Sequence, residues 1–99
     1  MKTYRHGDLL LVQVASIPTP AKRQKGHILA HGEATGHAHR LEGSGTLWMT
    51  PDGQLHFRAG KGARVVHEEH ATICLPPGDY RVVRQREYRP EAPPVQVVD

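Results

Sequence analysis

Eight histidines in a chain of 99 residues are the feature of this sequence with the clearest chemical meaning. Four of them form two close pairs, His37 with His39 and His67 with His70. Side chains two positions apart on a β-strand project from the same face, roughly 7 Å apart along the strand, so the first pair can converge on one ion. The second pair is three positions apart and converges only if the chain turns after Val66, through a bend or one helical turn.

Neutral imidazole is the commonest metal-binding side chain near pH 7. The two pairs therefore predict a site for a divalent transition metal, with zinc as the first candidate and iron, manganese and nickel as alternatives. Whether His70 or a glutamate completes the site stays open. The competing interpretation is a group of histidines that pack or hydrogen-bond without a metal. We prefer it for the four isolated histidines, which are His6, His27, His31 and His56.

Glu68 and Glu69 lie between the histidines of the second pair. Each is a candidate for a metal ligand, for the general base that takes a proton from a metal-bound water, or for the carboxylate that orients an imidazole. The pattern differs from the HExxH motif of zinc proteases, whose histidines are four apart on a helix. A divalent ion with a carboxylate beside it is typical of a metal-dependent hydrolase, and this is the function that we predict, with the two glutamates as catalytic residues.

Basic residues near the carboxyl end indicate the kind of substrate. The formal net charge of the chain is +3, and arginine recognises phosphate through paired hydrogen bonds. We expect a phosphate-containing substrate, such as a nucleotide or an RNA-linked ester. The residues expected to contact it are Arg81, Arg84, Arg86 and Tyr88.

Two other functions remain as alternatives. The first is a non-catalytic, metal-stabilised β-barrel that binds RNA or a protein partner through its basic face. The second is a homo-oligomer that carries its histidines at a subunit interface and senses metal or pH. No apolar run is long enough for a membrane span or a secretory signal, so we predict a cytoplasmic protein without a membrane partner.

The elements that must position these side chains are short β-strands. No stretch of a dozen residues has helical periodicity, and apolar runs alternate with turns rich in glycine, proline and aspartate. The clearest hairpin joins residues 46–50 to 54–58 through Pro51-Asp52-Gly53. Further strands are expected over residues 8–15, 27–31, 37–41, 63–67, 71–75 and 80–88, with an exposed basic loop over 21–26.

These elements predict an all-β fold of about seven or eight short strands. An antiparallel sheet of this size must protect its edges, so we expect a small antiparallel β-barrel, with a compact sandwich as the alternative. The length allows a single domain. We assign residues 1–89 to this β domain and residues 90–99 to a proline-rich C-terminal arm.

A few side chains can be assigned to the core or to the surface. Cys74 is the only cysteine and stands in an apolar run, so we expect it to be buried and to form no disulfide. Trp48 and Phe57 are expected to fill the core rather than stack on bases. Tyr80 and Tyr88 are the aromatic residues that we expect to contact an anionic partner.

Two resemblances accompany these residues. Gly36-His37-Ala38-His39, followed by Glu42 and by Leu75-Pro76-Pro77-Gly78-Asp79, resembles the cupin family, whose first motif supplies His-x-His and a glutamate from strands of a small barrel. In cupins the last histidine follows the Pro-x-Gly turn, whereas here the second histidine pair precedes it, so no cupin fold or ligand set is carried over. The whole chain resembles small bacterial and phage proteins with the same Gly-His-Ala-His and His-Glu-Glu-His blocks, a likeness that implies no function.

Overall fold

The computed structural model of the chain describes residues 2–32, 36–89 and 92–96, with the strands in 86–96 described as backbone alone. These residues form twelve strands and no helix. All of the strand pairings are antiparallel. The predicted all-β antiparallel class is therefore confirmed, whereas the predicted number of seven or eight strands is too low. No helix in the described residues is long and apolar enough to span a membrane.

The larger sheet has six strands in the order β1-β2-β10-β7-β6-β3. Their bounds are β1 Thr3–His6, β2 Leu9–Val14, β10 Gly78–Arg84, β7 Leu55–Ala59, β6 Gly45–Met49 and β3 Lys22–Gln24. The predicted hairpin is confirmed, because β6 and β7 pair in the register Leu47↔Phe57, and it lies between β10 and β3. The basic segment predicted as a loop is partly a strand, since β3 pairs with β6 and closes one edge of the sheet.

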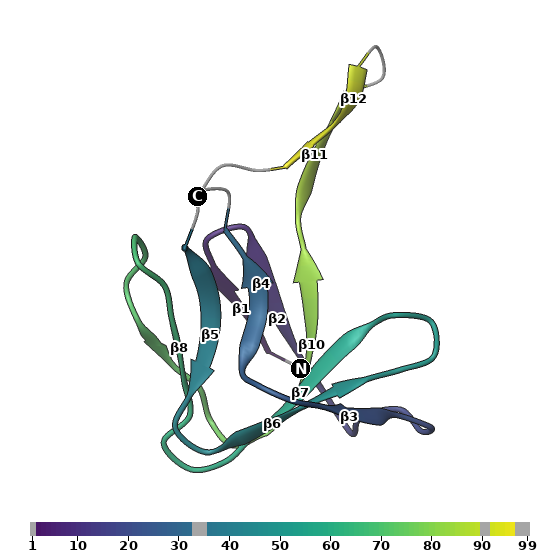
Figure 1. Cartoon of the computed structure of the whole chain (residues 1–99), viewed down its shortest axis with the longest axis vertical. Helices are drawn as coiled ribbons and strands as arrows, with labels where there is room; N and C mark the ends of the chain where they lie inside the picture. The colour runs from purple at the N-terminus through teal and green to yellow at the C-terminus, as the bar shows by residue number, and fades with distance from the viewer. Residues whose placement is uncertain (1, 33–35, 90–91, 97–99) are drawn as a thin grey trace.

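The smaller sheet has four strands in the order β4-β5-β8-β9. Their bounds are β4 Ile28–His31, β5 Ala38–Glu42, β8 Arg64–Val66 and β9 Ile73–Cys74. After β10 the chain forms a separate hairpin of β11, Arg86–Arg89, and β12, Ala92–Gln96, which extends away from the two sheets (Figure 1). The strand predicted over 80–88 is thus divided at Gln85 between β10 and β11, which is one reason why the predicted strand number was too low.

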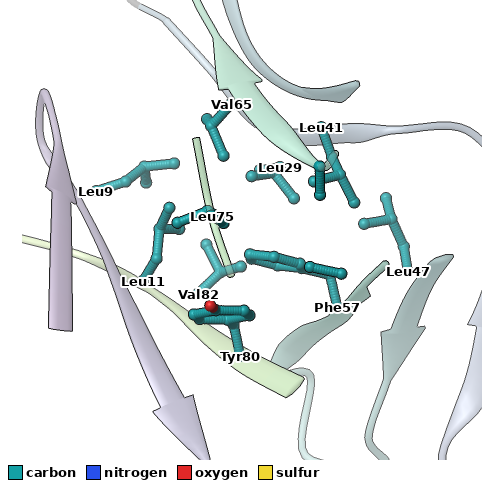
Figure 2. Packing of buried hydrophobic residues seen from close by; sticks show 12 residues of the cluster. Leu9, Leu11, Leu29, Leu41, Leu47, Phe57, Val65, Leu75, Tyr80 and Val82 are labelled. Carbon is teal, nitrogen blue, oxygen red and sulfur yellow. The ribbon is translucent and has the colours of Figure 1, made fainter. Parts of the chain in front are cut away.

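One apolar core lies between the two sheets (Figure 2). Successive residues of a strand face opposite sides, so each strand contributes alternate side chains to it. Phe57 stacks on Tyr80 with ring centres 4.9 Å apart and an interplanar angle of 14°. The residues shared by the two sheets are Leu9, Leu11, Leu29, Leu41, Leu47, Phe57, Val65, Leu75, Tyr80 and Val82. The pairings among the described strands leave both sheets open, so the preferred barrel does not close and the sandwich alternative describes the fold better.

Alternation along the strands corrects two of the side-chain predictions. Tyr80 points into the core together with Val82, is fully buried, and donates its hydroxyl hydrogen to the Pro76 carbonyl at 2.7 Å. It cannot contact an anionic partner. Cys74 is exposed rather than buried, because it lies on the outward side of the short strand β9 while Leu75 points inward.

The two aromatic residues of the β6–β7 hairpin differ in their burial. Phe57 has no exposed surface, as expected of a core residue. Trp48 is only half-buried and lies outside the core cluster, with its indole N–H donated to the Thr46 hydroxyl at 2.9 Å. The prediction of a core position therefore holds for Phe57 and is wrong for Trp48.

Candidate metal centre

Five histidines from three segments of the chain gather at one end of the core. His6 is the last residue of β1, His37 immediately precedes β5, His39 is the second residue of β5, and His67 and His70 lie in the bend that follows β8. The turn required after Val66 is therefore present as a bend. Because β1 belongs to the larger sheet and β5 to the smaller one, the histidines stand where the two sheets meet.

Four of the five rings surround a common centre. The six distances between the ring centres of His6, His39, His67 and His70 all lie between 4.5 and 6.3 Å. Four imidazoles bound tetrahedrally to zinc, with about 2.1 Å from metal to nitrogen and about 1.1 Å more to the ring centre, would have ring centres about 5 Å apart. The observed separations bracket this value.

The nitrogens of the two most deeply buried rings are fixed by their partners. The Nε2–H of His6 donates to the Ala71 carbonyl at 3.0 Å, and the Nε2–H of His39 donates to the Asp8 carboxylate at 3.2 Å. Both acceptors lack a proton of their own to offer, so each ring carries its proton on Nε2. The two Nδ1 atoms face each other at 2.8 Å. Two lone pairs at this distance repel, so the contact as it stands fits an N–H···N hydrogen bond with one proton shared by the rings, and a metal ion bound by both would separate the nitrogens to about 3.3 Å.

A buried chain of polar groups supports His39 from behind. Asp8, whose side chain is 2% exposed, accepts the His39 proton on Oδ1 and the Arg84 Nε–H on Oδ2, the latter at 2.7 Å. The same guanidinium donates to the His31 carbonyl. Carboxylates that hold metal-bound histidines in this way fix the ring orientation and make the metal-binding nitrogen more basic. Arg84 thus positions Asp8.

His67 stands between the buried rings and the surface. Its Nδ1 accepts the backbone N–H of Glu69 at 3.0 Å, and its buried Nε2 has no hydrogen-bond partner among the described residues. An unpaired buried nitrogen is costly. An ion at Nε2 would supply a partner, and it would require the ring proton to move to Nδ1 and the Glu69 contact to open.

The outer side of the cluster is formed by His37 and the two predicted catalytic glutamates. His37 Nδ1 lies 3.1 Å from Glu69 Oε1. Glu68 accepts the Ala38 N–H at 2.9 Å and the Arg40 guanidinium at 2.6 Å, and these two contacts lower its pKa to about 2. A carboxylate with so low a pKa is a poor base near neutral pH. Of the two glutamates, Glu69 is therefore the better candidate for accepting a proton.

Comparison with known proteins adds one finding. A family model described as a domain of unknown function, DUF8820, matches residues 5–85. The chain belongs to this family. No curated protein and no solved structure matches the chain. The expected likeness to small proteins without an assigned function is thereby confirmed, and the matched span of the DUF8820 domain contains the whole histidine cluster and ends before β11.

Within the DUF8820 domain, the structure brings the two predicted histidine pairs together and adds two residues that sequence reasoning missed. His6 was assigned to the isolated histidines, and Asp8 received no role. Their only signal is local, a histidine and an aspartate two positions apart around Gly7. Their partners His39 and Arg84 lie 33 and 76 positions away, a distance that no spacing rule covers.

Of the predicted substrate contacts, Arg84 reaches the cluster through Asp8, whereas Arg81 lies apart from it. Arg84 is held by Asp8, as described above. Arg81 is exposed, pairs in register with His56 across β10 and β7, and lines a separate surface groove with that histidine. The side chains of Arg86 and Tyr88 lie outside the described residues. A nucleotide or RNA partner remains a prediction.

Proposed function

We propose that this DUF8820 domain binds one divalent transition-metal ion through His6, His39, His67 and His70, with zinc as the first candidate. The arrangement of the four rings carries the proposal, because their centres lie 4.5 to 6.3 Å apart, around the value of about 5 Å expected for four imidazoles on one zinc ion. Two nitrogens on one tetrahedral zinc ion are about 3.3 Å apart, so the Nδ1 atoms of His6 and His39 have to separate by only about half an ångström. Imidazole ligands favour zinc, copper, nickel or iron over magnesium and calcium, which prefer oxygen.

Such an ion would connect the two sheets. His6 comes from the larger sheet and His39 from the smaller one, while the bend after β8 supplies the remaining two ligands. Small domains bury a limited core and are often stabilised by a metal. Since the metal binds the folded chain and not the unfolded one, its binding energy adds to the stability of the fold. The primary role that we propose is therefore a structural metal centre.

Metal content and thermal stability test the proposal together. Protein purified without a tag should contain roughly one ion per chain, and removal of the ion by a chelator should lower the melting temperature. At a free zinc concentration 100 times the dissociation constant, the stabilisation is about 2.7 kcal/mol, which corresponds to a shift of roughly 10–20 °C for a domain of this size.

A matched pair of variants completes this test. His39→Gln should lose both the ion and the stabilisation, whereas His27→Gln, an exposed histidine outside the cluster, should keep both. If the wild type binds no zinc at any concentration tested and the chelator does not change its melting temperature, the rings of His6 and His39 share a proton and not a metal ion, and the proposal is wrong.

Hydrolysis by the bound ion is the second candidate function, and it requires three histidine ligands with the fourth position open to water, in place of the closed four-histidine site. The observation that favours it is the pair formed by His37 and Glu69 on the exposed side of the cluster. The ring centre of His37 lies 5.7 Å from that of His67. A positioned base of this kind contributes about 10²–10⁴-fold to a rate. We expect the zinc-loaded protein to cleave an activated phosphodiester, with Glu69→Gln losing at least tenfold and Glu68→Gln retaining the rate. Equal rates in loaded and metal-free protein would remove this candidate.

A further inference from the structure

The exposure of the side chains falls steadily from the surface to the buried centre. It is 60% for Glu69, 32% for Glu68, 26% for His37 and 0% for His39. His67 lies between the last two, with its ring centre 5.7 Å from His37 and 4.5 Å from His39. One imidazole therefore contacts both an outer and a buried histidine.

A second set of donor atoms lies at the outer end of this row. Nitrogens of His37 and His67 and a carboxylate oxygen of Glu68 all lie within 4.8 Å of one another. Two histidines and a carboxylate are a common ligand set for a divalent ion, and they leave positions open for water. Both Glu68 oxygens accept one hydrogen bond each, and a carboxylate oxygen has a second lone pair available for a metal.

Gly32 keeps the space between the outer histidines open. A Cβ added at this position would lie 3.0 Å from the Cβ of His37 and 3.1 Å from Nε2 of His67. Its backbone is not in the left-handed region that requires glycine, so the close approach of the two histidines accounts for the absence of a side chain. Any other residue would press on the ring that the two ligand sets share.

We propose that His37, His67 and Glu68 form an outer uptake site, which captures a hydrated divalent cation and passes it to the buried histidines through their common ligand, His67. This inference rests on the proposed metal binding. During transfer the ion keeps His67 as a ligand while His37 and Glu68 are replaced by the buried rings. The ion is thus never released fully to water between the two positions. An uptake site of this kind changes the rates of binding and release and leaves the equilibrium affinity of the buried site nearly unaltered.

Stopped-flow binding of Co²⁺ to the metal-free full chain tests this, because Co²⁺ bound by imidazoles absorbs visible light. In His37→Ala and in Glu68→Gln, the association and dissociation rate constants should both fall at least tenfold, with the affinity kept within about twofold. Glu42→Gln is the matched control, because it removes the same charge from an exposed carboxylate on β5. It should bind at the wild-type rate. Gly32→Ala should slow uptake in the same way as the two outer variants.

Two results would overturn the inference. If the association rate stays at the wild-type value in both outer variants, the ion reaches the buried site by another route. If the affinity falls together with a faster release, these residues are ligands of the bound ion itself rather than a step on its way in. Absence of Co²⁺ binding in the wild type would instead refute the metal site, so the two failures are distinguishable. Circular dichroism of each variant separates misfolding from slow uptake. Both outer variants must show the same slow uptake, so a folding defect in one of them cannot decide the test.

Discussion

Replacing Asp8 by asparagine should separate the role of this carboxylate in metal binding from its role in the fold. The carboxylate accepts hydrogen bonds from both His39 and Arg84, at 3.2 and 2.7 Å. Asparagine keeps one acceptor oxygen, which Arg84 can retain, and presents an amide N–H to His39. His39 must then accept on Nε2 and move its own proton to Nδ1, the atom that faces His6 and the proposed ion.

The expected size of the effect follows from this change of tautomer. Loss of a carboxylate that supports a metal-bound histidine typically lowers affinity 10- to 100-fold, or by about 1.4–2.7 kcal/mol. In the metal-free protein the same change of tautomer stabilises the contact between His6 and His39, because the Nδ1–H of His39 can donate to Nδ1 of His6 with no added charge. Asp8→Asn should therefore weaken zinc binding while the metal-free fold loses at most the single charged hydrogen bond, about 1.5–3 kcal/mol.

Zinc affinity measured by competition with a chelating dye, and the protonated nitrogen of His39 identified by long-range ¹H–¹⁵N NMR, provide the two readouts. Asp79→Asn is the control, since Asp79 also pairs with an arginine, Arg58 at 2.9 Å, but contacts no histidine in the part of the chain that the structure describes. An Asp8→Asn variant that binds zinc as tightly as the wild type, with the His39 proton still on Nε2, would refute the reasoning.

Three further predictions concern the fold. Phe57→Ala should lower the free energy of unfolding by about 3–5 kcal/mol in urea titrations, because it empties a fully buried position stacked on Tyr80; a loss below 1 kcal/mol would show that the core collapses around the gap. Burial, with a smaller contribution from Tyr4, raises the pKa of Tyr80, so the wild type should lose stability as the pH rises above about 10. Tyr80→Phe should lack this loss, and at pH 7 it should be about 1 kcal/mol less stable because it lacks the hydrogen bond to Pro76. Since the pKa of Glu68 falls from 4.5 to about 2 on folding, its contribution to stability should be complete above pH 4.5 and disappear as the pH falls to about 2; acid unfolding of Glu68→Gln should show no such step, and identical acid profiles would contradict it.

The parts of the fold that could be predicted are those specified by nearby residues. The β6–β7 hairpin follows from alternating side chains and from a turn with glycine at position 53, where φ is +83°. Edge strands were harder, because β1 and β3 are short and polar and exist only through pairing with β2 and β6. Their polar sequences carry no strand signal of their own.

The candidate site divides in the same way. The spacing of the two histidine pairs is local, so the sequence could indicate a cluster, and the bend after β8 agrees with the turn that this cluster needed. His6 enters through a contact across the two sheets, which depends on the register of the whole fold. Arg84 was expected at a substrate because arginine commonly binds phosphate. The structure pairs it with an internal carboxylate, Asp8, a partner that the sequence did not indicate, and the substrate contact stays a prediction.

The pairing of β2 with β10 has a consequence for how the chain folds. Residues 9–14 find their central neighbour only in residues 78–84, and Asp8 meets Arg84 across 76 positions. During synthesis, β2 can therefore pair with β10 only after residues 78–84 have emerged from the ribosome. Folds dominated by such distant pairings typically form over milliseconds to seconds. His6 joins the other three histidines only when the larger sheet, which contains β10, packs on the smaller one, so a metal ion bound by all four would stabilise a topology that has already formed.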